Sequence, residues 1–340
     1  MSFSIVMMIR EREQPSHTKK EIRGCIDLGS SNFRLLVVGG SFPAAVLDVS
    51  SFELASFNET KRYVGWGDDL ARTGIISPEK AARAERALGE LLAAACAWGC
   101  ARPVVVATNT LRESTNASAV ASALEGALGI SIRVLPQRDE AALGYTGASF
   151  FRARGEALTL IDAGGTSTEV SWGRGTSMEG FAGIPVGTHR VRRLLAGAPG
   201  ARGVSAQLAA DLEEAGIRAP GRGERVYPLP AFTRDSTMLM TGGTAVSLAV
   251  FLRYMDGWPP AFQEMQLITR ADVALAERRF EGLRRAGRER AAPLDPDRIR
   301  LFPAGLVLIE ALLESARIEA FRVTARDLRW GVVLTGGISV

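Results

Sequence analysis

The sequence predicts an α/β fold made of a duplicated unit, with two lobes and a central cleft. The main observation is a pair of similar segments, IDLGSSN at 26–32 and IDAGGTS at 161–167, one in each half of the chain. Each is an apolar run that ends in Asp-x-Gly and is followed by small polar residues and a second apolar run. A length of 340 residues leaves room for two domains. We therefore expect two copies of one unit, each with a glycine loop.

The first half of the chain indicates three strands followed by alternating helices and strands. Ser77 is a good N-cap and Pro78 suits the first position of a helix, which Gly99 ends. The spacing of Thr110 and Glu113 is that of a capping box. The expected strands are 22–28, 33–38, 44–49, 103–107 and 131–135, and the expected helices begin at Pro78, Thr110 and Asp139.

The second half restarts this order with two strands around the second glycine loop. Thr269 and Asp272 have the spacing of another helix start of the capping-box type. The expected domains are a flexible lead at 1–20, an N-terminal lobe at 21–144 and a C-terminal lobe at 145–340. The expected strands are 158–163, 168–172, 178–184 and 237–240; the expected helices are 188–196, 204–216, 244–254, 270–285, 303–316 and 325–334, with surface loops at 197–203 and 217–230.

Composition excludes several classes of protein. The chain is 46% hydrophobic and 23% charged, as in an ordinary globular protein, and its net charge of +4 suits an anionic substrate without indicating nucleic-acid binding. No apolar run approaches the roughly 18 residues of a membrane span. Three sparse cysteines favour a reducing cytoplasm. With only His17 and His189 available, the chemistry must depend mainly on carboxylates.

The two glycine loops are candidate phosphate sites. Backbone N–H groups in a tight glycine turn can surround a phosphate, and hydroxyl groups add hydrogen bonds. The aspartate that ends each strand can face a hydrated Mg²⁺ ion. A plain turn with an aspartate cap fits the same pattern. The candidate cradle residues are Ser30, Ser31, Asn32, Gly164, Gly165, Thr166 and Ser167, and the strand-end carboxylates are Asp27 and Asp162.

Five blocks of the sequence resemble, in order, the exopolyphosphatase and guanosine pentaphosphate phosphatase family. The blocks that contain Arg112 and Glu140 distinguish this family from the kinases that share the glycine loops. The resemblance covers about residues 22–335 and implies two ribonuclease H-like domains of the actin-like ATPase fold, in the short form of the family without an extra C-terminal domain. The blocks are 26–34, 107–116, 139–145, 161–169 and 240–244.

The resemblance also implies a role for each candidate residue. Glu140 would be the catalytic base and Arg112 would contact phosphate, while Asp27, Asp162 and Glu169 would bind Mg²⁺, or Mn²⁺ in its place. From the residues alone, Asp139 and Glu140 lie in the first turn of a helix, where the dipole favours an ionised carboxylate. The spacing alone favours ordinary solvent-facing charges at a helix start, and the order of the family blocks is what favours catalysis, by Glu140 rather than Asp139.

The expected activity is therefore the Mg²⁺-dependent release of terminal phosphate from inorganic polyphosphate or guanosine pentaphosphate, with water activated by Glu140. Two alternatives stay open. One is a kinase or ATPase of the same fold. The other is a non-catalytic sensor of polyphosphate or a guanosine alarmone, because the family's usual Ser-Gly before the acidic pair is replaced at 136–138 by Pro-Gln-Arg. The expected partners are these polyanions, with no nucleic acid and no membrane, and the family leaves a homodimer open.

Overall fold

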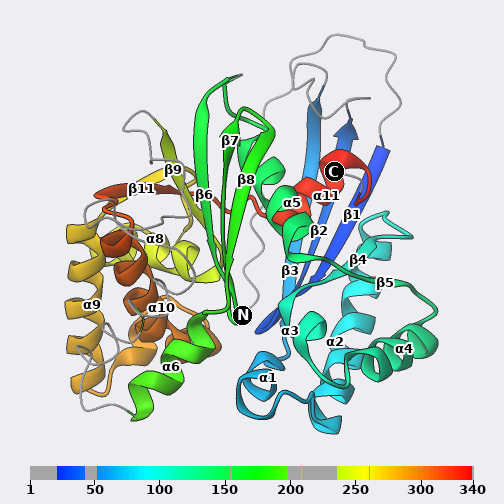
Figure 1. Ribbon diagram of the computed structural model, residues 1–340, viewed down its shortest axis with the longest axis horizontal. Coiled ribbons are helices and arrows are strands. Elements are labelled where there is room, and N and C mark those ends of the chain that lie inside the picture. The colour runs from blue at the N-terminus through cyan, green and yellow to red at the C-terminus, as the bar shows by residue number, and fades with distance from the viewer. Residues whose placement is uncertain are drawn as a thin grey trace, which may run out of the picture. The chain divides into compact units, whose positions relative to one another are not determined.

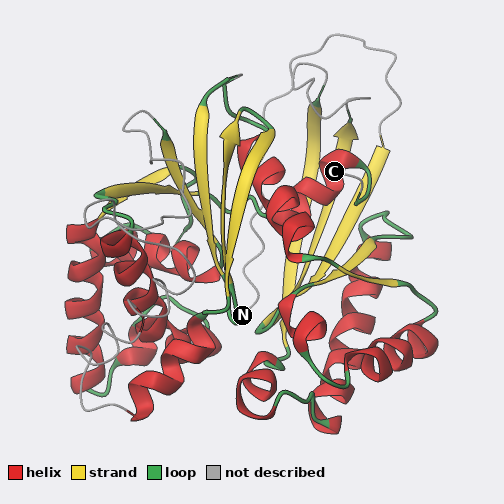
Figure 2. Ribbon diagram, viewed as in Figure 1, coloured by secondary structure: helices red, strands yellow, loops and turns green. Residues whose placement is uncertain are grey.

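The computed structural model describes residues 21–42, 52–153, 155–197, 208, 236–259 and 261–338. Contacts divide these residues into two compact units, each a sheet with helices against it (Figure 1, Figure 2). Unit 1 comprises the described residues up to Phe151 and those from Leu328 onward, and unit 2 comprises those from Arg152 to Asp327.

Unit 1 contains a five-stranded sheet in the order β3-β2-β1-β4-β5. The pairs β1–β2 and β2–β3 are antiparallel, whereas β1, β4 and β5 run parallel. The parallel strands therefore end at one edge of the sheet, where ligands bind in folds of this type. The elements are β1 (Glu21–Leu28), β2 (Asn32–Ser41), β3 (Glu53–Tyr63), α1 (Gly67–Thr73), α2 (Pro78–Ala97), β4 (Val104–Ala107), α3 (Asn109–Glu113), α4 (Ala117–Leu128), β5 (Ile132–Val134), α5 (Gln137–Ser149) and α11 (Leu328–Thr335).

Unit 2 repeats this topology. Its six-stranded sheet has the order β10-β11-β9-β6-β7-β8, so β8-β7-β6-β9-β11 follows the same path as β3-β2-β1-β4-β5. The predicted duplicated α/β fold is thus confirmed, with β10 as an added antiparallel edge strand. The elements are β6 (Ala157–Ala163), β7 (Thr168–Arg174), β8 (Ser177–Ile184), α6 (Thr188–Gly197), β9 (Thr237–Thr241), α8 (Gly243–Met255), β10 (Gln266–Thr269), α9 (Arg270–Arg285), η2 (Glu289–Ala291), α10 (Pro296–Ser315) and β11 (Ala320–Val323).

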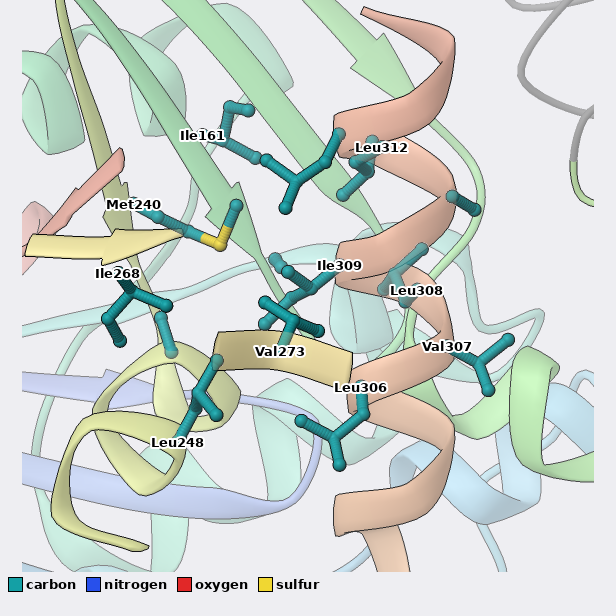
Figure 3. Packing of buried hydrophobic residues seen from close by; sticks show 14 of the residues in the cluster. Ile161, Met240, Leu248, Ile268, Val273, Leu306, Val307, Leu308, Ile309 and Leu312 are labelled. Atoms are coloured by element: carbon teal, nitrogen blue, oxygen red, sulfur yellow. The ribbon is translucent and has the colours of Figure 1, made fainter. Parts of the chain in front are cut away.

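Hydrophobic clusters fix each sheet to its helices. In unit 1 one cluster joins the sheet to α2 and α4, and a second joins the opposite face to α5 and α11. In unit 2, Ile161 and Met240 on the sheet pack with Leu248 of α8 and Ile309 of α10 (Figure 3). Both faces of the unit 1 sheet are covered, as expected where a sheet has parallel strands.

Of the three helix caps expected from the sequence, those at Ser77 and Thr269 form and the one at Thr110 does not. Ser77 caps α2, and its hydroxyl accepts a hydrogen bond from the Lys80 amide at 3.4 Å. The capping box of Thr269 and Asp272 forms at the start of α9. The capping box predicted at Thr110 is wrong, because α3 already begins one residue earlier and its first backbone bond goes to the carbonyl of Thr108.

Other elements extend or correct the sequence analysis. The strand β3 was not expected, nor were β10 and β11. The helix α10 begins at Pro296 rather than near 303, and Pro303 lies inside it. The lead at 1–20, the strand expected at 44–49, the helix at 204–216 apart from residue 208, and the loops at 198–203 and 217–230 lie outside the described residues.

Contacts also divide the chain differently from the expected boundary at 144/145. The helix α11 packs on α5, and a Cβ at Gly331 would overlap the backbone of Leu143. The C-terminal residues from Leu328 therefore belong with unit 1, and α5 stays whole within it. The predicted central cleft stays a prediction. No helix in the described parts of the chain combines the length and the apolar character that crossing a bilayer requires.

Candidate active site

Loop 1, residues 29–31, joins β1 to β2 and has its carbonyl groups fixed by the segment 64–67. The Ser30 carbonyl accepts an amide N–H at 2.9 Å, and the Ser31 carbonyl accepts two at 2.9 and 3.0 Å. A trans peptide carries its N–H opposite its C=O, and no peptide bond of the described residues is cis. The amides of Ser31 and Asn32 are therefore directed away from this segment, in the way that backbone N–H groups gather around an anion.

Loop 2, residues 164–167, has the same construction in unit 2. The carbonyl groups of Gly164 and Gly165 accept N–H groups from the start of α6, at 3.1 and 2.8 Å. By the same peptide geometry, the amides of Gly165 and Thr166 are directed away from α6. The turn is closed by a hydrogen bond of 2.9 Å from the Gly164 amide to the Ser167 carbonyl.

Both loops require glycine at their first position. A Cβ at Gly29 would lie 2.9 Å from the carbonyl oxygen of Asn32, and a Cβ at Gly164 would lie 2.8 Å from that of Ser167. Side chains do not tolerate such contacts with backbone atoms, so the two turns share one steric constraint. The side chains of Ser30, Ser31, Asn32 and Ser167 are buried, and Gly164, Gly165 and Thr166 are half-buried.

Arg112 and Glu140 meet at the edge where β4 and β5 end. One terminal nitrogen of Arg112 donates to the Glu140 carboxylate at 2.8 Å and to the Leu135 carbonyl at 2.9 Å, and the other donates to the Asn109 side chain at 3.1 Å. The sequence predicted a role for each residue but not this ion pair. Arg112 follows β4 and Glu140 follows β5, and these strands are parallel neighbours. This position after two neighbouring strands is the signal from which the ion pair could have been predicted.

Glu140 lies in the first turn of α5, and its amide bonds to the Pro136 carbonyl at 3.0 Å. Its side chain is 11% exposed, compared with 17% for Arg112. The Glu140 side chain is thus nearly buried, and the positive charge of Arg112 offsets its negative charge. An ionised carboxylate held at a fixed position has the geometry that a general base requires.

The strand-end carboxylate of unit 1 is held by a guanidinium group. Asp27 on β1 and Arg34 on β2 are cross-strand partners, and Arg34 donates to the Asp27 carboxylate at 2.8 Å. The Asp27 side chain is only 2% exposed. A buried carboxylate is compatible with this position because the guanidinium offsets its charge.

The strand-end carboxylate of unit 2 has an acidic neighbour. Asp162 and Glu169 lie directly opposite each other in the β6–β7 ladder, so their side chains share one face of the sheet. Gly242, with φ of 93°, leaves space beside Asp162, because a Cβ there would lie 2.8 Å from the carboxylate. The sequence did not indicate Arg298 of α10, whose guanidinium lies where a Cβ of Gly243 would be.

These carboxylates can be tested against the needs of Mg²⁺. The described residues contain no group of three or more His, Cys, Asp or Glu side chains that could hold a metal ion. Mg²⁺ nevertheless keeps several waters and is usually bound by one or two carboxylates plus substrate phosphates. The neighbouring Asp162 and Glu169 have the two carboxylates of that mode, and Asp27 has one carboxylate, of which one oxygen accepts from Arg34.

Comparison with known proteins shows which family the sequence resembles. A family model for the Ppx/GppA phosphatase family matches residues 45–336. A protein named exopolyphosphatase 2 from Mycobacterium tuberculosis is 26% identical over 326 residues, which cover 91% of this chain and 97% of the relative. A guanosine-5'-triphosphate,3'-diphosphate pyrophosphatase from Photobacterium profundum is 24% identical over 317 residues, covering 91% of this chain and 58% of that protein.

Solved structures show the same fold. An exopolyphosphatase from Cytophaga hutchinsonii superposes with a TM-score of 0.77 at 19% identity, covering 94% of this chain and 100% of the other. The PPX-GPPA enzyme of Aquifex aeolicus superposes with a TM-score of 0.69 at 18% identity, covering 93% and 100%. Because the family model matches most of the sequence and these structures share the fold, the chain belongs to the Ppx/GppA phosphatase family.

Proposed function

We propose that this protein is a phosphohydrolase that releases the terminal phosphate of inorganic polyphosphate, guanosine pentaphosphate or both. The observation that carries the proposal is the pair of Arg112 and Glu140, which lies at the same edge of the unit 1 sheet as loop 1. Membership of the family supports the reaction class. The names of the relatives, an exopolyphosphatase and a guanosine pentaphosphate pyrophosphatase, support the two substrates.

In the proposed reaction, Glu140 accepts a proton from a water molecule. The water oxygen forms a bond to the terminal phosphorus, the anhydride P–O bond breaks, and the leaving oxygen departs with the electron pair. The products are orthophosphate and a chain that is one phosphate shorter. Phosphoryl transfer depends mostly on positioning and charge stabilisation. The loop amides supply hydrogen bonds to the phosphoryl oxygens, and Arg112 holds Glu140 in place.

The proposed cofactor is Mg²⁺, with Mn²⁺ as the alternative, and it would offset the charge of the phosphate chain. Asp162 and Glu169 are the proposed ligands in unit 2. Asp27 is the proposed ligand in unit 1, where a hydrated ion would have to share the carboxylate with Arg34. Removal of divalent metal with a chelator is expected to abolish phosphate release, and addition of Mg²⁺ is expected to restore it.

The substrate class is tested by measuring phosphate release from a panel of compounds. The panel contains polyphosphates of several lengths, guanosine pentaphosphate, ATP and pyrophosphate, each with Mg²⁺ or Mn²⁺. We expect release from polyphosphate, guanosine pentaphosphate or both, and little from ATP. Preferential turnover of ATP would support a kinase or ATPase instead, and tight binding without turnover under any metal would support a sensor.

The catalytic role is tested with Glu140→Gln, which keeps the shape of the side chain but cannot accept the proton. We expect substrate binding to persist while kcat falls at least about a hundredfold, the usual contribution of a general base. Asp139→Asn is the matched control, because it changes the neighbouring acid of the same helix turn. Turnover by Glu140→Gln at the parent rate would exclude Glu140 as the base.

We further propose that the protein acts in the cytoplasm, as its sparse cysteines indicate.

A homodimer stays a prediction from the family resemblance. Light scattering across a concentration series would measure the mass of the particle in solution. A constant mass close to the 36.3 kDa of one chain would exclude a stable dimer.

A further inference from the structure

We propose that Trp66 is a positioning residue for loop 1 and that it acts through its indole N–H group. The inference rests on the proposed function, because loop 1 is taken as a phosphate cradle. Trp66 donates a hydrogen bond of 3.0 Å from its indole nitrogen to the carbonyl oxygen of Gly29. Its part in the site comes from this one contact.

The indole completes a clamp on three successive carbonyl groups. Gly29 is held by Trp66, while Ser30 and Ser31 are held by amides of the segment 64–67. Each of these carbonyls belongs to a trans peptide whose N–H is directed the opposite way. By fixing the Gly29 carbonyl, Trp66 therefore fixes the direction of the Ser30 amide N–H. In the same way, the hydrogen bonds to the Ser30 and Ser31 carbonyls fix the directions of the Ser31 and Asn32 amides. Three consecutive amide N–H groups are then directed to the side of loop 1 opposite the segment 64–67.

Packing fixes the direction of the indole group. Trp66 is fully buried, and its ring meets that of Phe33 edge to face, with centroids 4.7 Å apart. Both residues belong to the hydrophobic cluster between the sheet and α2. The ring has no space in which to turn, so its N–H group stays directed at loop 1.

The chain that follows Trp66, residues 67–77, is itself anchored at two places. Asp69 in α1 accepts hydrogen bonds from the hydroxyl and the amide of Ser77, at 2.6 and 2.9 Å. Asn116, at the start of α4, accepts from the Ile76 amide at 3.0 Å and donates to its carbonyl at 2.8 Å. Residues 67–77 are thus connected to α2 and α4, and the preceding segment 64–67 is connected to loop 1, the candidate phosphate site.

Unit 2 contains a counterpart of this clamp. The segment after β8, which corresponds to β3, donates the amides of Thr188 and His189 to the carbonyls of loop 2. In both units the chain that follows the third strand therefore holds the glycine loop. In unit 1 a side chain takes part in the clamp, and it can be changed without altering the backbone.

Loss of the indole N–H group is expected to weaken substrate binding. Without the indole donor, the Gly29–Ser30 peptide loses the partner that fixes its plane, and the Ser30 amide loses its direction. The loop contacts the phosphoryl group in the ground state and the transition state alike. Weakening such uniform binding raises KM and leaves kcat nearly unchanged.

The experiment replaces Trp66 with its benzothiophene analogue, which has nearly the same shape and no N–H group, and also prepares Trp66→Phe. Trp98→Phe is the matched control, because Trp98 packs against the same cluster at the opposite end of α2. Calorimetry measures the binding of inorganic phosphate and of a defined polyphosphate. We expect about fivefold weaker binding for both Trp66 variants, the effect of one net hydrogen bond, with unchanged binding for Trp98→Phe.

Kinetics provide the second measurement. We expect KM to rise by the same factor while kcat stays within about twofold for the analogue. The inference is overturned if the analogue binds both anions as the natural chain does, if Trp98→Phe weakens binding equally, or if the natural chain binds neither anion. A natural chain that binds but never hydrolyses would refute the proposed hydrolase, while the binding measurement would still decide the role of Trp66.

Discussion

Arg112 shows how much a single side chain can organise at the candidate site. Its guanidinium group bonds to Glu140, to the Leu135 carbonyl and to Asn109. Lysine at this position offers one ammonium group, which cannot reach all three acceptors with the same geometry. We therefore expect Arg112→Lys to lower kcat/KM about tenfold or more, since the base loses its fixed position.

Steady-state phosphate release measures this change. Arg133→Lys, an exposed arginine on β5, is the matched control and is expected to keep the parent rate. Equal rates for the natural chain and Arg112→Lys would show that the fork of hydrogen bonds has no part in activity.

A second prediction concerns the pH dependence of stability at Asp69, which is 5% exposed. Burial alone would raise the pKa of Asp69, but hydrogen bonds from Ser77 and the charge and hydrogen bond of Arg72 outweigh it and lower the pKa. A lowered pKa in the folded state means that the unfolded chain binds the proton more readily. The stabilisation is therefore present above the ordinary aspartate pKa of about 4 and is lost as the pH falls through the lowered value.

We expect Asp69→Asn to reduce the free energy of unfolding by about 1–3 kcal/mol at pH 7. The difference from the natural chain is expected to shrink as the pH falls below about 4, where the carboxylate of the unfolded chain takes up its proton, and to be lost once the pH passes the lowered pKa of the folded state. Urea unfolding at a series of pH values measures both effects, with Asp139→Asn as the control. A difference that stays constant down to pH 2.5 would contradict the assignment.

At this scale the sequence indicated candidate residues but not the partners that they contact. The resemblance indicated Arg112 and Glu140, but an ion pair over 28 positions requires knowledge of which strands are neighbours. Arg298 had no signal, because its position beside Gly243 depends on how α10 packs against α8. Trp66 lies in a segment that the resemblance covered, yet its contact with Gly29 is set by tertiary packing.

Among the elements, the closest helix pair in unit 1 is that of α5 and α11. A Cβ at Gly331 would overlap the backbone of Leu143, and backbone atoms cannot move aside as a flexible side chain can. We expect Gly331→Ala to reduce the free energy of unfolding by about 1–3 kcal/mol. Because α5 bears Glu140, kcat is expected to fall as well.

Gly282→Ala is the matched control for this prediction. Gly282 lies inside α9, and a Cβ there would meet nothing within 4 Å. Alanine favours a helix interior, so this variant is expected to gain up to about 1 kcal/mol. Urea unfolding measures both variants, and a Gly331→Ala variant as stable as the natural chain would show that the two helices can separate without cost.

The elements also show where local sequence signals suffice. The capping box at Thr269 forms as expected, because the residues that make it are three apart and need no distant partner. The same pattern at Thr110 fails, since β4 ends so close to α3 that the helix begins at Asn109. The short strands β10 and β11 had no clear pattern, and their pairing with each other and with β9 establishes them.

At the scale of the whole molecule, the sequence predicted the duplication and missed the return of the chain to unit 1. The paired glycine loops indicated two copies, and the repeated strand order confirms this. The expected boundary at 144/145 left the last helix in the second lobe, because position along a chain is the natural guide to a domain. The burial of its side chains instead places α11 in unit 1, because they complete the hydrophobic cluster that includes Leu36 and Val106.

Deletion of residues 328–340 is therefore expected to affect unit 1 and to spare unit 2. It removes five buried apolar side chains of α11 from one face of the unit 1 sheet, a loss of more than about 5 kcal/mol at about 1.5–3 kcal/mol each. Hydrogen exchange measured by mass spectrometry is expected to show fast exchange in β1 and β2 and unchanged protection in β6 and β9, which provide the internal control. An equal increase in the exchange rate in both units would contradict this division, because α11 would then protect strands of unit 2 as well as those of unit 1.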